Sequence, residues 1–452
     1  MRSIAIIGGG PAGSMAAGTL AHGGATVTVY EEKVPWEKPC GGGLTYKVLE
    51  RYPFLLAATA PVNYVHQMEI IAPNGVSARF GLPKPVAIYA RATLNQLLYE
   101  RALAAGACPI QDRIVDIEPT GRGWRLRGRR REYESDYVIL ATGTGSGLRS
   151  RLTTDPAPPD YLLTFGYYLP GCDDLLRIRF FEDFEGYAFA FPRTDHISVG
   201  IGGRCGHCRM AELRDRLHGF MRECGYRTEG ATVYSHLLPS LRACSWGRMT
   251  LSGTNWALVG DTAGLVDPVT GEGIGFAMRS GELAAESLLS PMLGAYPDRV
   301  WQEFGRTMAQ GARLLPHFYR GSALGRAIPT LMVELIAHSD RFQKLFTDLV
   351  EAWPFLEGFG ARVCRSLAAS IGDVLLGPLR EALRQVASSR DMSDRFGTSG
   401  RTRVDHAPLA GSPGSPGYLG GTRTRPASLP RITRRANSGK GCQGVAGAGG
   451  GS

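Results

Sequence analysis

The stretch SIAIIGGGPAGSMAAGTLAHGGATVTVYEE, residues 3–32, predicts a buried strand, a glycine turn, a helix and a second strand. Its turn has the spacing Gly8-x-Gly10-x-x-Gly13. Gly8 permits the tight turn, Gly10 lets the backbone approach a pyrophosphate, and Gly13 lets the helix pack closely on the strand. The helix N-terminus then offers free N–H groups and a partial positive charge to the phosphates. The stretch therefore predicts a dinucleotide site at the edge of a parallel sheet.

Glu31 strengthens this prediction, because it ends the second strand where a carboxylate can accept hydrogen bonds from ribose hydroxyls. A second strand-turn-helix unit, WALVGDTAGLVDPVTGEGIGFAMRSG, spans residues 256–281. Its strand delivers Asp261, whose carboxylate can hold a ribityl or ribose hydroxyl. Its glycines precede a helix whose positive end can face the electron-rich edge of a flavin. Two such units far apart in the sequence favour one long cofactor, FAD rather than NAD(P), that reaches across the sheet.

The net charge of the 452 residues is +10, which raises the question of a nucleic-acid partner. From residue 391 onward, however, eight Arg and one Lys face three Asp, so most of the excess lies in the tail. That tail, residues 391–452, is rich in Gly, Pro, Ser and Arg and is predicted to be disordered. We therefore expect no nucleic-acid partner, and a weak contact of the tail with anionic lipid or RNA is the less favoured alternative.

The composition predicts a cytoplasmic protein. No apolar run reaches the ~18 residues of a membrane span, and a strand that begins at Ser3 leaves no room for a signal peptide. The nine cysteines have no framework spacing, which favours a reducing compartment. The motif Cys205-Gly-His-Cys208 has no second pair at a suitable spacing, and the histidines form no cluster, so we expect no metal site.

The order of the expected elements predicts an α/β fold: a Rossmann-type FAD-binding domain with an inserted β-rich substrate domain and a C-terminal helical region. The predicted ranges are 1–60, 90–155 and 250–290 for the FAD-binding domain, 61–89 and 156–249 for the substrate domain, 291–390 for the helical region and 391–452 for the tail.

Over roughly residues 1–385 the chain resembles FAD-dependent oxidoreductases of the glutathione-reductase structural class. Within that class it is similar to the geranylgeranyl reductase family, which saturates isoprenoid double bonds. The resemblance implies a bound FAD, with Arg91 in IYARATLNQLL near the cofactor and the backbone of Val115 near the adenine. The implied cofactor contacts are Gly8, Gly10, Ala12, Gly13, Glu31, Cys40, Gly41, Gly43, Arg91, Val115, Asp261, Gly273 and Ile274.

One segment departs from many relatives. DYVILATGTGSGLRS, residues 136–150, has Thr142-Gly143 where hydroxylases that bind both FAD and NAD(P)H carry Asp-Gly, although Ser146 and Arg149 keep the expected spacing. The missing carboxylate weakens a monooxygenase interpretation. It also leaves the electron donor open between NAD(P)H and a donor protein such as ferredoxin.

A cysteine followed by three glycines stands in KPCGGGLTYKVL, residues 38–49. The resemblance implies that Cys40, Gly41 and Gly43 lie beside the isoalloxazine ring. Glycines there would let the backbone lie against the flavin with no Cβ in the way and leave room for a flat alkene chain. Cys40 is a candidate proton relay, but a packing role as a small apolar residue is favoured.

The stretch EGYAFAFPRTDHISVGIGG, residues 185–203, alternates as a strand does, so its aromatic residues share one face. An ordinary hairpin core would explain this pattern alone. The family, however, carries Tyr-x-Trp-x-Phe-Pro, seven residues and Gly-x-Gly at its substrate pocket, and here Phe189 replaces the Trp. The match implies substrate contacts at Tyr187, Phe189, Phe191, Pro192, Gly200 and Gly202.

The resemblance thus implies reduction of carbon–carbon double bonds of a prenyl lipid. Protonation of an isolated alkene and hydride transfer from flavin N5 would pass through a cation, which aromatic faces stabilise in a dry pocket. The alternatives are a flavin monooxygenase or halogenase-like enzyme acting on an aromatic or other hydrophobic substrate, and a non-enzymatic flavin electron carrier. The apolar stripe Leu331, Met332, Leu335 and Ile336 favours core packing, with a peripheral membrane contact as the alternative.

Overall fold

The opening stretch forms the centre of a six-stranded sheet, as the sequence predicts. In the computed structural model, β1 (Ser3–Ile7) pairs in parallel with β2 (Thr26–Tyr30) on one side and with β10 (Tyr137–Leu140) on the other. β6 (Cys108–Ile110), β16 (Ser252–Gly253) and β17 (Trp256–Leu258) complete the order β16-β17-β10-β1-β2-β6. Strands from distant parts of the chain therefore end at one edge of the sheet, where this fold class binds ligands.

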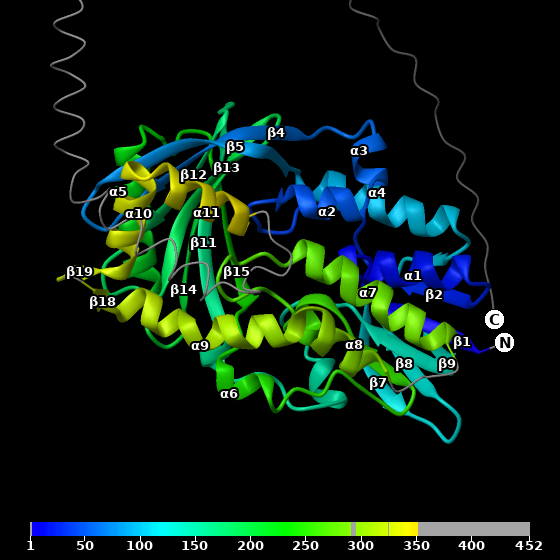
Figure 1. The fold of residues 1–452 in the computed structure, drawn as a ribbon. Helices are drawn as coiled ribbons and strands as arrows, with labels where there is room; N and C mark the ends of the chain where they lie inside the picture. The colour runs from blue at the N-terminus through cyan, green and yellow to red at the C-terminus, as the bar shows by residue number, and fades with distance from the viewer. Residues whose placement is uncertain (1, 291–294, 324, 351–452) are drawn as a thin grey trace, which may run out of the picture. The chain divides into compact units, whose positions relative to one another are not determined.

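Helices α1 (Pro11–His22), α4 (Arg91–Ala104) and α7 (Ile274–Leu289) pack together beside this sheet (Figure 1). α1 and α7 approach closely because small residues meet at their contact. A Cβ on Gly281 would lie 2.2 Å from the carbonyl oxygen of Ala12. The close packing fixes the start of α7 next to the glycine turn after β1.

The second sheet has eight strands and is mainly antiparallel, with the order β15-β11-β14-β13-β12-β4-β5-β3. Its β4–β5 hairpin turns at Pro73-Asn74-Gly75, and Gly75 adopts a φ of +89°. Helix α5 (Met210–Glu223) packs on strands β11, β13 and β14. The strands are β3 (Gly43–Leu44), β4 (Asn63–Ile71), β5 (Ser77–Ile88), β11 (Tyr161–Pro170), β12 (Leu175–Phe180), β13 (Gly186–Pro192), β14 (His196–Arg204) and β15 (Thr232–Pro239).

Helices in the last described part of the chain flank this sheet. α10 (Ile328–His338) and α11 (Asp340–Val350) contact β5 and lie in front of the sheet in Figure 1, with α9 (Arg306–Arg320) below them. The remaining elements are α2 (Tyr46–Arg51), α3 (Phe54–Ala57), α6 (Ala243–Trp246), α8 (Tyr296–Val300), the hairpin β18 (Ser322–Ala323) and β19 (Arg326–Ala327), and a small sheet of β7 (Ile114–Pro119), β8 (Trp124–Gly128) and β9 (Glu132–Ser135).

The structure describes residues 2–290, 295–323 and 325–350. The chain divides into the units Met1–Ser388 and Ser389–Ser452, and the predicted disordered tail lies outside the described residues, as does the helical region beyond 350. The α/β fold class is confirmed, whereas the limits of the domains stay a prediction. Among the described residues, no helix combines the length and apolar character needed to cross a membrane.

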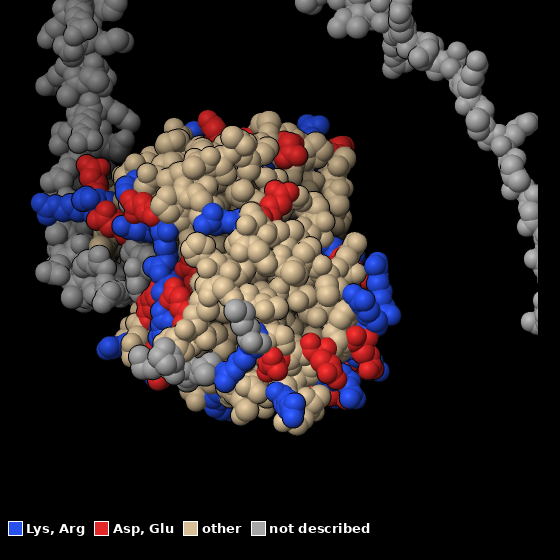
Figure 2. Space-filling model, turned by 90° about the vertical axis from the view of Figure 1, so that its right-hand side faces the viewer, with Lys and Arg blue, Asp and Glu red and all other residues tan. Residues whose placement is uncertain are grey.

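The surface of the described part carries mixed charge. On the face shown in Figure 2, basic and acidic side chains are interspersed around a broad uncharged centre and gather in no basic patch. This distribution gives no sign on that face of the electrostatic footprint that nucleic-acid binding requires.

Candidate active site

A cavity of about 770 Å³ joins the glycine turn after β1 to the apolar faces of α9, α10 and α11. Its two ends are built by different parts of the fold. One end is formed by the edge of the six-stranded sheet, and the other by strands β4, β12 and β13 with the facing helices. The predicted site residues that line it are Gly8, Gly10, Ala12, Glu31, Cys40, Gly41, Gly43, Arg91, Tyr187, Phe189, Phe191, Asp261, Gly273 and Ile274.

The other predicted residues do not line this cavity. Gly13 lies beneath the turn, where a Cβ would come 1.9 Å from the carbonyl oxygen of Gly8. Gly200 pairs with Phe189 across β13 and β14 and leaves room for its ring, because a Cβ there would lie 2.6 Å from Phe189 Cζ. Val115, on β7, is 43% exposed. Pro192 ends β13, and Gly202 pairs with Tyr187 across β13 and β14, so both belong to the strand pair that carries the wall.

The glycine turn has the geometry that a pyrophosphate needs. Gly8 adopts a φ of +108°, and a Cβ there would lie 2.4 Å from the carbonyl oxygen of Ala141. No atom lies within 4 Å of the position of a Cβ on Gly10. The Gly9 N–H donates a hydrogen bond of 2.8 Å to Glu31 Oε2, which holds the carboxylate beside the turn. Gly10 therefore borders open space at the N-terminus of α1, as a phosphate cradle requires.

The charged centre of the cavity surrounds Asp261, which follows β17. Lys38 forms an ion pair with the Asp261 carboxylate. Burial disfavours the charged form of Asp261, but the positive charges of Lys38 and Arg91 outweigh it and hold its pKa below the usual range. Burial, together with the charge of Lys38, lowers the pKa of His236 to about 4, so its imidazole is neutral at pH 7. Lys38 and His236 had no distinguishing pattern in the sequence.

Four polar atoms of cavity residues are buried and have no hydrogen-bond partner within the described residues. They are Arg91 Nε, Thr144 Oγ1, His236 Nε2 and Glu272 Oε1. Most buried polar groups in folded proteins are paired, so four unpaired ones around one cavity indicate a polar ligand. FAD fits this set, because its phosphates, ribityl hydroxyls and pyrimidine ring carry donors and acceptors along its length.

The structure explains why the three positions after Cys40 are glycine, which the sequence alone did not. A Cβ on Gly41 or Gly43 would lie 3.0 Å or 2.7 Å from the ring of Phe191, and Gly42 has a φ of +86° with its Cβ position 2.1 Å from the carbonyl oxygen of Tyr89. The sequence predicted that these glycines make room for flavin and alkene. The structure shows that they first make room for the ring of Phe191 and for the backbone of Tyr89.

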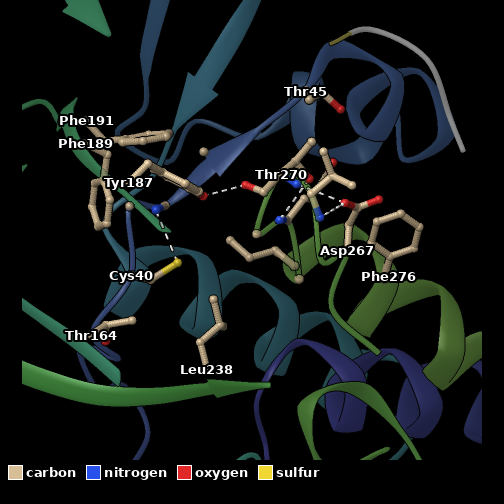
Figure 3. A pocket seen from close by; sticks show the side chains of 18 of the residues that line it. Cys40, Thr45, Thr164, Tyr187, Phe189, Phe191, Leu238, Asp267, Thr270 and Phe276 are labelled. Atoms are coloured by element: carbon tan, nitrogen blue, oxygen red, sulfur yellow. Dashed lines mark hydrogen bonds between the residues drawn. The ribbon is translucent and has the colours of Figure 1, made fainter. Parts of the chain in front are cut away.

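A buried arginine from the β13–β14 turn holds the Cys40 loop in place. Arg193, 1% exposed, donates a 2.7 Å hydrogen bond to the Cys40 carbonyl and contacts Glu37 at 2.5 Å. Ser198 Oγ donates to the same carbonyl at 3.0 Å. The Cys40 thiol accepts a 3.3 Å bond from the Gly42 N–H (Figure 3). The loop that carries the thiol is thus tied to the strands of the aromatic wall.

The aromatic wall has the predicted alternation. Tyr187, Phe189 and Phe191 line the cavity, whereas Ala188 and Ala190 are fully buried on the opposite face of β13. The rings of Phe189 and Phe191 pack edge to face, with centroids 5.4 Å apart. Figure 3 shows Tyr187 pointing toward the loop after β17, where its hydroxyl donates a 2.6 Å hydrogen bond to the Thr270 carbonyl.

The helices complete an apolar section that faces this wall. Leu331, Met332 and Leu335 of α10 line the cavity, and Leu335 and Ile336 also belong to the buried core between α10 and the sheet. The stripe therefore packs as predicted and also forms a wall that the sequence did not indicate. Further apolar side chains come from α9 and α11: Leu314, Leu315, Phe318, Phe342, Leu345 and Phe346.

Comparisons with known proteins find oxidoreductases. Residues 2–161 match the pyridine nucleotide-disulphide oxidoreductase family. A chloroplastic geranylgeranyl diphosphate reductase of Oryza sativa subsp. japonica is 28% identical over 64% of this chain and 66% of its own length. A menaquinone reductase of Mycobacterium tuberculosis is 27% identical over 75% of this chain and 92% of its own. The matched stretch thus spans somewhat less than two thirds of the plant relative.

Solved structures share the fold. A geranylgeranyl bacteriochlorophyll reductase-like protein from Thermoplasma acidophilum superposes with a TM-score of 0.64 at 20% identity, covering 84% of this chain and 98% of its own. A flavin-dependent brominase superposes with a TM-score of 0.63 at 19% identity, and the match covers 82% of this chain and 99% of the brominase chain. At such identities the likeness concerns the fold alone.

The fold and the sequence matches make the chain similar to FAD-dependent oxidoreductases, and the residues that line the cavity fit FAD. Its resemblance to the geranylgeranyl reductase family, which the sequence suggested, is confirmed.

Proposed function

We propose that the protein reduces carbon–carbon double bonds of a prenyl lipid. The observation that carries this proposal is the continuity of one cavity, in which the expected flavin contacts lead directly into a long apolar section. A prenyl chain has the length and the apolar character to fill such a section. Two relatives are named as a geranylgeranyl diphosphate reductase and a menaquinone reductase, and the two substrates in these names both carry a prenyl chain.

The proposal assigns each part of the cavity a task. Gly10 and Glu31 would bind the pyrophosphate and the ribose of FAD, Asp261 the ribityl chain, and Gly273 and Ile274 the flavin. Reduced FAD supplies a hydride when bound. The aromatic face of β13 would stabilise positive charge on the alkene, and the apolar helices would exclude water from it.

The experiment is an anaerobic single turnover. The protein is loaded with FAD, reduced, and mixed with geranylgeranyl diphosphate or menaquinone, and flavin oxidation is followed together with the mass of the prenyl chain. We expect lipid-dependent oxidation and a chain that gains hydrogen. Without lipid-dependent oxidation, but with hydroxylation or halogenation of an aromatic compound in air, the reductase proposal fails and the monooxygenase or halogenase alternative replaces it.

Cys40→Ala separates the two roles of the thiol. Because Cys40 packs against the cluster around Leu44 and Tyr89, and its thiol only accepts a local hydrogen bond, we expect it to fill space. The variant should bind FAD and reduce lipid at a rate within about threefold of the wild type, well short of the 10²–10⁴-fold that a proton donor contributes. A hundredfold loss of rate at saturating lipid would instead assign proton transfer to Cys40.

A further inference from the structure

Reduction of an isolated alkene needs a proton as well as a hydride, and the cavity offers few acids. The Tyr187 hydroxyl is a poor candidate, because it already donates its hydrogen to the Thr270 carbonyl at 2.6 Å. Burial also raises the pKa of this phenol, which makes it a weaker acid than tyrosine in water. His236 is neutral, because burial and the charges of Lys38 and Arg91 lower its pKa, so it is not an imidazolium that could give up a proton.

Glu272 has the position that an acid requires. It lies between Gly271 and Gly273, in the loop that leads into α7, and lines the cavity. Gly271 is adjacent to the aromatic wall, since a Cβ on it would lie 2.6 Å from the Tyr187 hydroxyl. Glu272 Oε1 has less than 1 Å² of accessible surface and no hydrogen-bond partner among the described residues.

The charged group that acts on Glu272 is a second carboxyl group, Asp267, which is buried and close enough to interact with it electrostatically. Asp267 Oδ1 accepts hydrogen bonds from the N–H groups of Val269 and Thr270 at 2.8 and 2.9 Å. Among the salt bridges of the described residues, none includes Glu272. Glu272 as a residue is half-buried, but its Oε1 is inaccessible, and a charged oxygen buried without a partner is costly, so the neutral form of this group is favoured.

We propose that the Glu272 carboxylic acid is the proton donor of the reduction. Resting on the proposed function, the step transfers the carboxyl proton to one alkene carbon as the π bond breaks, and the hydride supplied by reduced flavin forms the C–H bond at the other carbon. The alkene gains two hydrogens, the flavin is oxidised by two electrons, and Glu272 is left as a carboxylate. Solvent returns its proton, and the flavin would be restored by a hydride from NAD(P)H or by two one-electron transfers from a donor such as ferredoxin together with a solvent proton.

The titration of Glu272 agrees with this role. Burial and the neighbouring charge of Asp267 raise the pKa of Glu272 to about 8. Burial likewise raises the pKa of Asp267, against the opposing effect of its backbone hydrogen bonds. The Glu272 carboxyl group therefore keeps its proton at pH 7, yet remains acidic enough to give it up, as carboxyl groups in apolar sites can.

The test compares Glu272→Gln with Asp267→Asn in the FAD-loaded protein, by anaerobic single turnover with geranylgeranyl diphosphate and with menaquinone. Both variants are isosteric, and both remove one buried carboxyl group from the same loop. We expect Glu272→Gln to bind FAD and lipid normally and to lose at least about 100-fold in the rate of reduction. Asp267→Asn keeps its acceptor oxygen but removes the charge that helps to raise the Glu272 pKa, so it should lose part of the rate at pH 7, less than Glu272→Gln loses. A wild-type rate in Glu272→Gln overturns the inference, as does a loss confined to Asp267→Asn.

A second readout does not depend on turnover. Because the Glu272 pKa is raised in the folded state, folding takes up a proton at this site, and the stability it confers is lost as the pH rises from the ordinary Glu value of about 4.3 through about 8. Relative to the wild type, Glu272→Gln should therefore gain melting temperature steadily over this interval. A constant difference between the two proteins would contradict a protonated Glu272.

The two readouts also separate this inference from the function on which it rests. If the wild type reduces neither lipid, the proposed function fails, whatever the pH titration shows. If the wild type reduces a lipid and Glu272→Gln does so equally well, only the assignment of the proton donor fails.

Discussion

Gly10→Val is expected to abolish FAD binding while the protein stays folded. The backbone of Gly10 is extended, with φ −71° and ψ −174°, which a β-branched residue adopts easily. No atom lies within 4 Å of its Cβ position, so the valine side chain meets no part of the protein. It would project instead into the space where the pyrophosphate approaches the N-terminus of α1. The measurement is flavin absorbance per protein, released on denaturation, beside a circular dichroism spectrum.

Gly13→Val provides the contrasting control. A Cβ on Gly13 would lie 1.9 Å from the carbonyl oxygen of Gly8 and 3.1 Å from the Ala141 side chain, so the turn itself must open. We expect this variant to lose folded structure as well as FAD. A Gly10→Val protein that is yellow, with one flavin per chain, would show that the turn after β1 does not hold the pyrophosphate.

The sequence could predict those parts of the site that lie within one local pattern of strand, turn and helix. The turn after β1 and Asp261 after β17 were predictable, because each lies in a local strand-turn-helix pattern whose geometry determines the residue type. Glu272 and Asp267 both stand inside the second of these patterns, but Tyr187, which lies next to Glu272's neighbour Gly271, comes from a distant strand that only the tertiary fold brings near.

Other parts of the site lacked any local pattern. Lys38 reaches Asp261 from a loop more than 200 positions earlier in the chain, and Arg193 reaches Cys40 from a turn more than 150 positions later. The sequence of helix α10 showed an apolar stripe, but the same stripe can form a core or a cavity wall equally well. Which of the two it forms depends on how far the helix stands from β4 and β5, and a single sequence does not contain that distance.

The largest expected loss in the apolar section comes from Phe189→Ala. The ring of Phe189 lies in the middle of the aromatic wall and packs over Gly200, its partner on β14. Removing a ring that is fully desolvated against the substrate costs about 1.5–3 kcal/mol, which corresponds to roughly a tenfold to more than hundredfold loss in kcat/KM. The ring is remote from the glycine turn, so FAD content should not change.

Phe189→Leu separates the loss of the aromatic face from the loss of apolar area, and Phe181→Ala is a control for losing a phenylalanine ring outside the cavity. Leucine keeps much of the apolar area but has no aromatic face, so a loss of cation stabilisation should lower kcat while KM changes little. Phe181 follows β12, packs against Phe184 in the core on the side of α5, and lies outside the cavity lining. Phe181→Ala should therefore lower stability but not the rate of reduction by the folded protein. Equal rates for wild type and Phe189→Ala, with FAD bound in both, would mean that the substrate does not meet the aromatic wall, and the prenyl chain would have to be sought elsewhere along the cavity.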